Sequence, residues 1–261
     1  MLPLIGVTAF VASALTLFSG FGLGTLLLPA FALFMAPEVA VGATAVVHGL
    51  NSLFKLVLIG RSAAGRVVVR FGLPAILAAF AGAAILAALA ARPPLLVWSW
   101  RGGTAAVTPL KLVMGLLILV FALVELAPRL DRIAVSERWL PYGGALSGFF
   151  GGLSGHQGAL RSIFLRRAGL APATLAATQA ALACMVDVAR LAVYGLGAWR
   201  QHFAALAAPG AWVPVAVGTA CAFAGAILGA RLLPKVTVGG LRLLTGILLV
   251  VVGTGLAAGI L

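Results

Sequence analysis

Polar residues recur at helical spacing in the segment 38–60, which is otherwise almost entirely apolar. His48, Ser52 and Lys55 stand at positions i, i+4 and i+7, so in a helix they share one face, and Asn51 lies beside them. Imidazole, amide and ammonium groups can bind an anion by donating hydrogen bonds to it. The stripe therefore predicts an anion contact, unless Lys55, which lies near the end of the segment, only extends its ammonium group to water.

The segment 172–196 carries a second polar face, with Gln179, Asp187 and Arg190. An unpaired charged carboxylate inside a lipid-embedded helix costs roughly 2.5–3.5 kcal/mol. We therefore expect Asp187 to pair with Arg190 one turn further on, to pair with Lys55 from the other segment, or to carry a proton. Asp187 is a candidate for function, and the alternative is a purely structural ion pair.

Two glycine-rich breaks precede these polar stripes. A helix that begins after such a break directs its free N–H groups and its positive dipole end at the break, which suits an anion. Glycines also let helices pack closely, so small-residue helix contacts are the alternative. The candidate ligand contacts are Ser19, Gly20, Gly22, Gly24 and Thr25 in the first break and Ser154, Gly155, His156, Gln157 and Gly158 in the second, with Arg161 shortly after it.

The composition places these residues in lipid. Of the 261 residues, 63% are hydrophobic and only 9% are charged, whereas a soluble domain carries about 25% charged residues. At about 20 residues for each span, the chain has room for roughly ten spans. The net charge of +13 comes from Lys and Arg scattered between apolar runs, a pattern that indicates membrane orientation rather than nucleic-acid binding.

Charged residues, prolines and glycines divide the chain into ten apolar segments. We expect all of them to be helices, because lipid offers the backbone no hydrogen-bond partners. The short segments beside the two breaks either span the membrane or dip in and return. The segments are 3–18, 25–35, 38–60, 70–91 and 109–127 in the first half, and 140–153, 158–168, 172–196, 211–230 and 238–260 in the second.

The two halves resemble copies of one unit. Pro37 and Pro172, each at the start of a long segment, are 135 residues apart, and so are Gly60 and Gly195, at the ends of those segments. Landmarks that share one offset indicate a duplication. The sequence therefore predicts a first membrane repeat at 1–128, a cytoplasmic linker at 129–139 and a second membrane repeat at 140–261.

Five segments in each unit, an odd number of crossings, predict that the second repeat is inverted relative to the first. The predicted fold is an all-α integral membrane protein of two inverted repeats with 8–10 transmembrane helices and interrupted or re-entrant glycine-rich segments. We expect a multi-pass protein of the inner (plasma) membrane, and the positive-inside rule places both termini outside the cytoplasm. The cytoplasmic loops would carry Arg61, Arg66, Arg70, Arg129, Arg132, Arg138, Arg166, Arg167, Arg231, Lys235 and Arg242.

Other reactive residues give weaker signals. Cys184 and Cys221 lie within apolar runs, where a thiol packs as a small hydrophobic group, so we predict no disulfide, no metal site and no cofactor.

One motif raises the possibility of an enzyme. Gly152-Leu-Ser154-Gly155 fits the nucleophile pattern of rhomboid intramembrane proteases, which need a histidine base within hydrogen-bond reach of the serine. Neither His156, inside the break, nor His202, in a polar connection, lies on a well-placed downstream helix. We therefore expect no enzymatic activity.

The stretch Ser19-Gly-Phe-Gly-Leu-Gly-Thr-Leu-Leu-Leu-Pro29, the following Gly42-Ala-Thr44 and their second-half counterparts resemble the sulfite exporter TauE/SafE family of membrane permeases. The resemblance spans nearly the whole chain and is strongest at 17–61 and 145–195. It implies ATP-independent transport, generally export, of sulfite, sulfonates or related organosulfur anions. The second half departs from the family pattern at His156-Gln157, where glycines are usual, and at Phe164, where a proline is expected, which bears on the substrate.

The resulting hypothesis is a secondary transporter, an exporter, of a small anion. The anion would lie between the two breaks, held by backbone N–H groups and by the polar residues named above. The expected partners are this anion and the lipid bilayer, with no nucleic acid, and homo-oligomerisation stays open. The alternatives are a membrane-embedded enzyme such as an intramembrane serine protease and an accessory subunit that does not itself transport.

Overall fold

The computed structural model describes residues 1–19, 23–100, 103–126, 136–165, 168–196, 210–232 and 238–261. All ten predicted apolar segments form helices, with bounds close to those expected. The helices are α1 (Leu2–Ser19), α2 (Leu23–Ala32), α3 (Pro37–Ile59), α4 (Gly65–Ala90), α5 (Pro109–Leu126), α6 (Leu140–Ser154), α7 (Gly158–Leu165), α8 (Pro172–Leu196), α10 (Val213–Leu232) and α11 (Val238–Ala257), with short 3-10 turns at Gly60–Ser62 and Glu137–Trp139.

Several helices are long and apolar enough to cross a membrane. Four meet both criteria within the described residues: Val39–Ser62, Gly65–Ala90, Pro172–Gly195 and Val213–Arg231. α2 is only 10 residues long and α7 only 8, so at 1.5 Å per residue neither can cross a hydrocarbon core of about 30 Å. The fold class predicted from the sequence, an all-α integral membrane protein with short segments beside the breaks, is confirmed.

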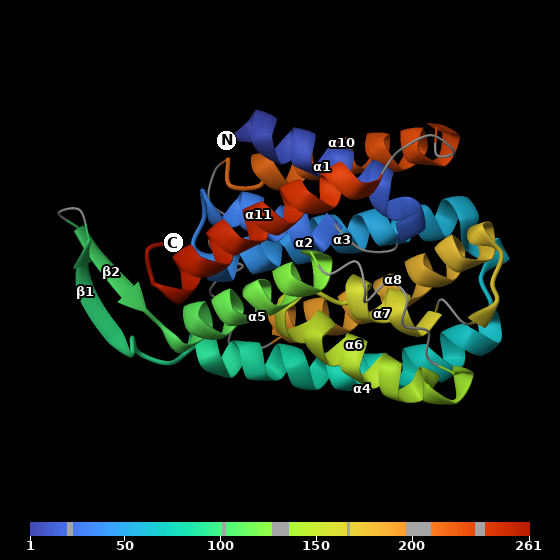
Figure 1. The fold of residues 1–261 in the computed structure, drawn as a ribbon, viewed down its shortest axis with the longest axis horizontal. Helices are drawn as coiled ribbons and strands as arrows, with labels where there is room; N and C mark the ends of the chain where they lie inside the picture. Colours follow the sequence, from blue (N-terminus) through green and yellow to red (C-terminus); the bar gives the residue numbers. More distant parts are fainter. Residues whose placement is uncertain (20–22, 101–102, 127–135, 166–167, 197–209, 233–237) are drawn as a thin grey trace.

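The connection between α4 and α5 contains a β-hairpin that the sequence analysis did not predict. Strand β1 (Leu96–Trp100) pairs with β2 (Gly103–Val107) in antiparallel register. The aromatic and β-branched residues of the hairpin favour strands. The run is short, however, so dividing the sequence at charged residues and prolines does not reveal it as a separate element. The Ala106 N–H donates to the Gly259 carbonyl and the Trp98 indole to that of Ala258. The hairpin, which projects beyond the helices in Figure 1, is thereby tied to the end of the chain.

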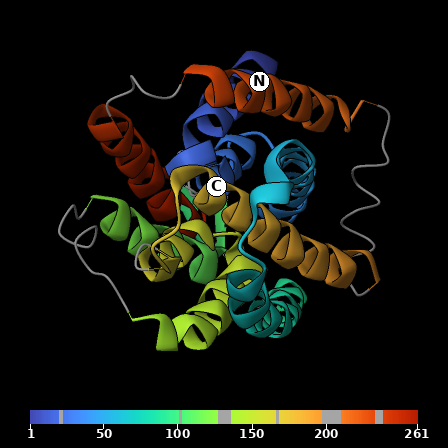
Figure 2. The same ribbon diagram turned by 90° about the vertical axis from the view of Figure 1, so that its right-hand side faces the viewer.

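The helices pack in pairs that repeat between the two halves. α1 lies against α10 and α6 lies against α4, while α3 packs on α8 and α5 on α11. In Figure 1, α1 and α6 begin at opposite ends of the molecule, and Figure 2, which looks along most of the helices, shows these pairs side by side. Two copies related by a twofold axis would produce this set of pairs. The arrangement supports the inverted repeats and their boundaries, which stay predictions.

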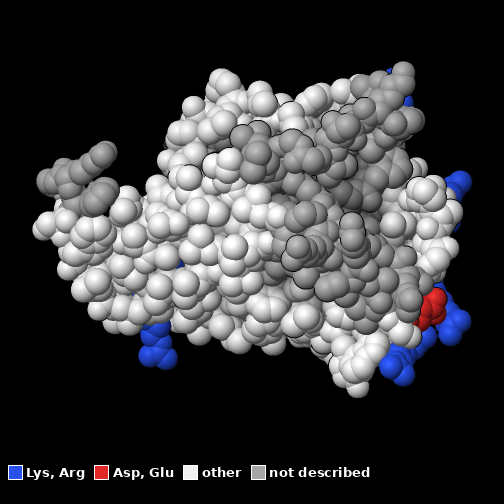
Figure 3. Space-filling model, viewed as in Figure 1, with Lys and Arg blue, Asp and Glu red and all other residues white. Residues whose placement is uncertain are grey.

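The exposed charged side chains of the described residues lie mostly at one end of the molecule. The connection between α3 and α4 and the starts of α6 and α8 lie at one end, while both termini and the β-hairpin lie at the other. Arg61, Arg66 and Arg138 are exposed in the segments at the first end. On the face shown in Figure 3, the coloured side chains gather mostly at that end and the flank between is almost uncharged. The assignment of the arginine-bearing end to the cytoplasm stays a prediction.

Glycines bring the paired helices into backbone contact. A Cβ atom at Gly144, Gly148 or Gly152 of α6 would overlap a main-chain carbonyl oxygen of α4, and Gly225 of α10 faces the Phe10 carbonyl of α1 in the same way. Apolar side chains gain nothing by leaving lipid for one another, so such close approach is what stabilises helix pairs in a membrane. These glycines therefore take the packing role that the sequence analysis held as its alternative for glycine-rich stretches.

A single methyl group added at Gly148 should push α4 and α6 apart. We expect Gly148→Ala to lower the free energy of unfolding by about 1–3 kcal/mol. The new Cβ would meet the Ala75 carbonyl, which is part of the backbone and cannot rotate away as a side chain could. Titrating the protein, purified in a mild detergent, with a denaturing detergent measures this change.

The control is Gly195→Ala near the end of α8, where a Cβ meets no atom within 4 Å. Alanine is the better helix former, so this variant should be neutral or slightly stabilised. Equal stability of the two variants would contradict the packing role of Gly148.

Candidate functional site

A buried carboxylate, Asp187, links the two long helices. His48 Nδ1 on α3 lies 2.6 Å from Asp187 Oδ2 on α8, and Arg190 Nη2 lies 2.8 Å from Asp187 Oδ1. The Asp187 and Arg190 side chains are each only 1% exposed. Gly49, next to His48, faces the same residue: a Cβ there would be in van der Waals contact with the Asp187 Cβ, at 3.4 Å. Of the three possibilities that the sequence left open for Asp187, the structure supports pairing with Arg190, and it adds His48.

The second break contributes a further link to the same carboxylate. Gln157 Nε2 donates to Asp187 Oδ1 at 3.2 Å, and Arg161 Nη1 donates to Gln157 Oε1 at 3.2 Å. Ser147 of α6 donates to the Gln157 carbonyl at 2.8 Å, which fixes the break against the helix before it. Asp187 therefore accepts from α3, from the break and from its own helix.

The two glycine-rich breaks meet. A Cβ at Gly24, at the start of α2, would lie 3.2 Å from the Gly155 carbonyl oxygen and 3.4 Å from His48 Cδ2. Gly155 ends α6 with φ +80°, a left-handed conformation that glycine adopts without strain. Its open side faces Arg190, whose Nη1 would be 2.7 Å from a Cβ at this position. Backbone of the first break thus lies beside the His48 imidazole, and backbone of the second break lies beside the Arg190 guanidinium.

Lys55 belongs to a second polar group, two turns further along α3. Its Nζ donates to the Ser13 carbonyl of α1 at 3.4 Å and, with the Asn51 amide in its better orientation, to Asn51 Oδ1 at 3.3 Å. The Asn51 nitrogen then donates to the Ala222 carbonyl of α10 at 3.2 Å. Lys55 is 8% exposed. Its ammonium group is buried here rather than extended to water.

His156 in the second break is held by two contacts. Its Nδ1 lies 3.1 Å from Ser154 Oγ, and its ring stacks on that of Phe121 from α5 at a centroid distance of 4.9 Å and an interplanar angle of 8°. The side chain is 2% exposed. The ring orientation is therefore fixed, and its second nitrogen, Nε2, has no hydrogen-bond partner among the described residues.

Positive charge exceeds negative charge in this buried region. The charged residues in the described core are Lys55, Arg161 and Arg190, against the single carboxylate of Asp187. Several cations buried close together repel one another, and a bound anion would reduce that repulsion. Arg190 Nε is also buried without a hydrogen-bond acceptor among the described residues. Among the described residues, no three His, Cys, Asp or Glu side chains gather in one place.

The structure places most of the predicted ligand contacts around this cluster. Gly24, His48, Gly155, His156, Gln157, Arg161, Asp187 and Arg190 lie together, Lys55 and Asn51 form the neighbouring group, and Thr25 and Gly158 stand at the first turns of α2 and α7. Gly20, Gly22 and the Ser19 side chain lie outside the described residues.

Sequence reasoning missed several members of the site. Ser13 and Ser147 each support one of the polar groups, and they are 134 residues apart. This nearly equals the offset of the other repeat landmarks, so the duplication itself could have identified them. Tyr194, whose hydroxyl donates to the Gly152 carbonyl at 2.9 Å, and Phe121 carry no such signal.

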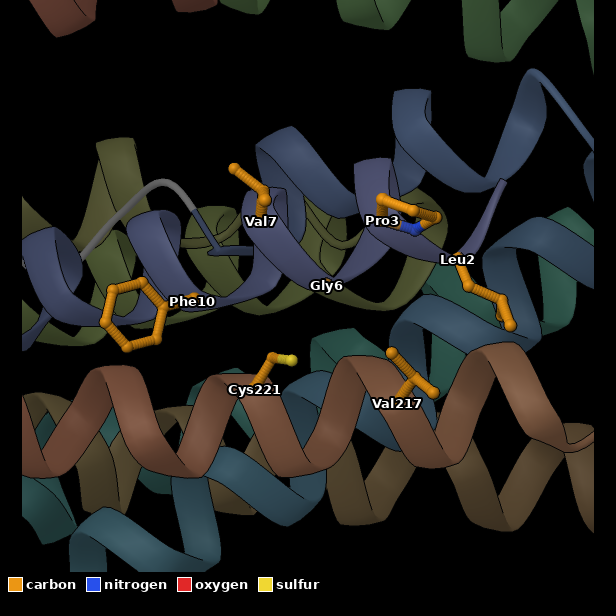
Figure 4. A pocket seen from close by; sticks show the side chains of 7 residues that line it. All are labelled: Leu2, Pro3, Gly6, Val7, Phe10, Val217 and Cys221. Atoms are coloured by element: carbon orange, nitrogen blue, oxygen red, sulfur yellow. The ribbon is translucent and has the colours of Figure 1, made fainter.

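A groove on the flank of the molecule is of a different kind. This groove, of about 540 Å³, runs between α1 and α10, from Leu2 to Phe10 on one side and past Val217 and Cys221 on the other (Figure 4). Its lining has no charged side chain, and it is open on the flank of the molecule. An apolar flank of this kind suits lipid chains, so the groove is not a site for a charged ligand.

The close approach of Gly155 to Arg190 can be tested by substitution. We expect Gly169→Ala, at φ +61° with no atom within 4 Å of a Cβ, to lose only the roughly 1–2 kcal/mol of left-handed strain. Gly155→Ala should lose more than this, because the methyl group also displaces the Arg190 guanidinium from Asp187. Unfolding in detergent compares the two variants, and equal losses would show that Arg190 is not held in place at Gly155.

Comparison with known families identifies the chain as a whole. Residues 5–256 match the model of the sulfite exporter TauE/SafE family, a range that includes both breaks and every residue of the cluster. Neither the curated proteins nor the solved structures contain a match. The family comprises membrane transporters rather than enzymes, in agreement with the multi-pass helical fold. The resemblance seen in the glycine-rich motifs is confirmed, and the chain belongs to the sulfite exporter TauE/SafE family.

Proposed function

We propose that this membrane transporter carries a small anion of the sulfite or sulfonate kind, and that the anion binds where the two breaks meet. The observation that carries the proposal is the excess of buried positive charge beside Gly24 and Gly155. Arg190 and Arg161 supply guanidinium donors, which bind oxyanions in a planar, two-pronged geometry. α7 begins at Gly158, so the free N–H groups of its first turn lie next to the same break.

The arrangement of the helices supports transport by alternating access. Transporters built from inverted repeats bind their substrate near the middle of the membrane, at interrupted helices between the repeats. Here both interruptions and both central helices, α3 and α8, contribute to one cluster. We further propose that the protein is an exporter in the plasma membrane, since the family is one of exporters. By the positive-inside rule, the arginine-bearing end of the molecule would lie in the cytoplasm.

One observation favours an enzyme as the second candidate. His156 Nδ1 lies 3.1 Å from Ser154 Oγ, within reach of a serine nucleophile. However, the Ser154 hydroxyl donates its proton to the Phe150 carbonyl at 3.1 Å, so the imidazole is not positioned to remove it. Labelling of Ser154 by a serine-directed fluorophosphonate would favour the enzyme, and we expect no labelling.

Transport can be tested directly with purified protein. We expect proteoliposomes to take up sulfite, with thiosulfate and simple sulfonates as further candidates, because the buried cations favour small oxyanions over neutral solutes. Uptake of radiolabelled anion with and without protein measures the flux. Absence of flux for every anion, from protein shown to be folded, would overturn the proposal and favour a non-transporting accessory subunit.

The buried cations should be needed for this flux. We expect Lys55→Ala and Arg190→Ala each to lower sulfite flux at least about tenfold, which is the effect of losing roughly 1.4 kcal/mol of charge-assisted binding. Arg92→Ala, which removes an exposed arginine outside the helices, should leave flux unchanged. Expression level and elution as a folded species show that the variants are intact. Full flux in both core variants would mean that these cations serve only the fold.

A further inference from the structure

Two hydrogen bonds determine which nitrogen of His156 carries a proton. The Ser154 hydroxyl donates to the Phe150 carbonyl, an atom that can only accept. The Ser154 oxygen is therefore left as an acceptor for the His156 nitrogen 3.1 Å away, so Nδ1 must carry the hydrogen that it donates. In the neutral ring this leaves Nε2 as an acceptor.

The accepting nitrogen is buried without a partner. The His156 side chain is 2% exposed, and Nε2 meets no hydrogen-bond donor among the described residues. Stacking on Phe121 and the Ser154 contact together prevent the ring from turning Nε2 toward another group. A buried acceptor without a donor costs about 1–3 kcal/mol. Such a cost at a rigidly held side chain points to a ligand that donates a hydrogen bond there.

A donor without an acceptor lies close by. The guanidinium group of Arg190 covers Gly155, the residue directly before His156, and its Nε is buried with no acceptor among the described residues. A second positive charge on His156 would be repelled by this guanidinium, which favours the neutral ring. The region around Gly155 therefore offers one charged donor and one neutral acceptor.

We propose that His156 determines specificity by accepting a hydrogen bond from the transported anion. The preferred ligand is then a monoanion that carries both an oxyanion group, for Arg190, and an O–H or N–H donor, for His156 Nε2. Hydrogensulfite and hydroxylated sulfonates have this chemistry, whereas simple alkylsulfonates and fully deprotonated oxyanions lack the donor. The proposal rests on the proposed function, since it names the class of anion bound at the same site.

The test compares two anions of equal charge and nearly equal size. Hydroxymethanesulfonate carries a hydroxyl group where ethanesulfonate carries a methyl group. We expect the wild-type protein to bind hydroxymethanesulfonate about tenfold more tightly, the ratio that one buried hydrogen bond provides. Thermal stabilisation of the detergent-purified protein by each anion gives the affinities and requires no flux, so a failure of transport does not affect this result.

Two variants assign the preference to His156. His156→Phe keeps an aromatic ring to stack on Phe121 but has no nitrogen, so the ratio of the two affinities should fall to about one. Trp212→Phe, an aromatic substitution at an exposed position, should retain the tenfold ratio. Equal affinities in the wild-type protein, or a preference that persists in His156→Phe, would overturn the proposal while leaving the proposed anion transport intact.

Discussion

The buried carboxylate of Asp187 is the constraint around which the centre of this protein is organised. Without donors, a charged carboxylate could not remain 1% exposed inside a lipid-embedded helix. His48, Gln157 and Arg190 provide those donors from three elements, so satisfying one side chain fixes α3, α8 and the second break relative to one another. Arg161 and Lys55 are buried in the same region as this carboxylate and Arg190, so its described residues carry more positive than negative charge, which suits an anion.

Because glycine has no side chain, main-chain atoms as well as side chains can approach this buried centre. Along the paired helices, glycines lack the side chain that would keep two backbones apart. The main chains of α4 and α6, and of α1 and α10, are therefore in direct contact. At Gly24 and Gly155 the same property has another result, because the absent Cβ atoms leave room for the His48 imidazole and the Arg190 guanidinium. One residue type thus serves packing in one place and the candidate site in another, and only the neighbours distinguish the two uses.

The sequence predicted the helices well because lipid leaves long apolar runs no alternative conformation. It also identified Asp187 as an acid that needs a partner or a proton, with Arg190, one turn further on, among the candidate partners. It could not select His48 over Lys55 as the second partner, because both lie on one helix face and only the crossing of α3 and α8 brings His48 to the carboxylate. The stacking of Phe121 on His156 and the β-hairpin depend on tertiary contacts that no local pattern records.

The two halves share a plan, but their polar residues are not shared equally. The first break, Ser19 to Thr25, contains no ionisable side chain, whereas the second contains His156 and is flanked by Arg161. If the halves exchange roles during a transport cycle, the exchange therefore does not regenerate an equivalent environment for the anion. The inward-facing and outward-facing states must then differ in intrinsic free energy. The asymmetry therefore affects how the carrier is distributed between its two states, while the direction of net transport still depends on the gradients across the membrane.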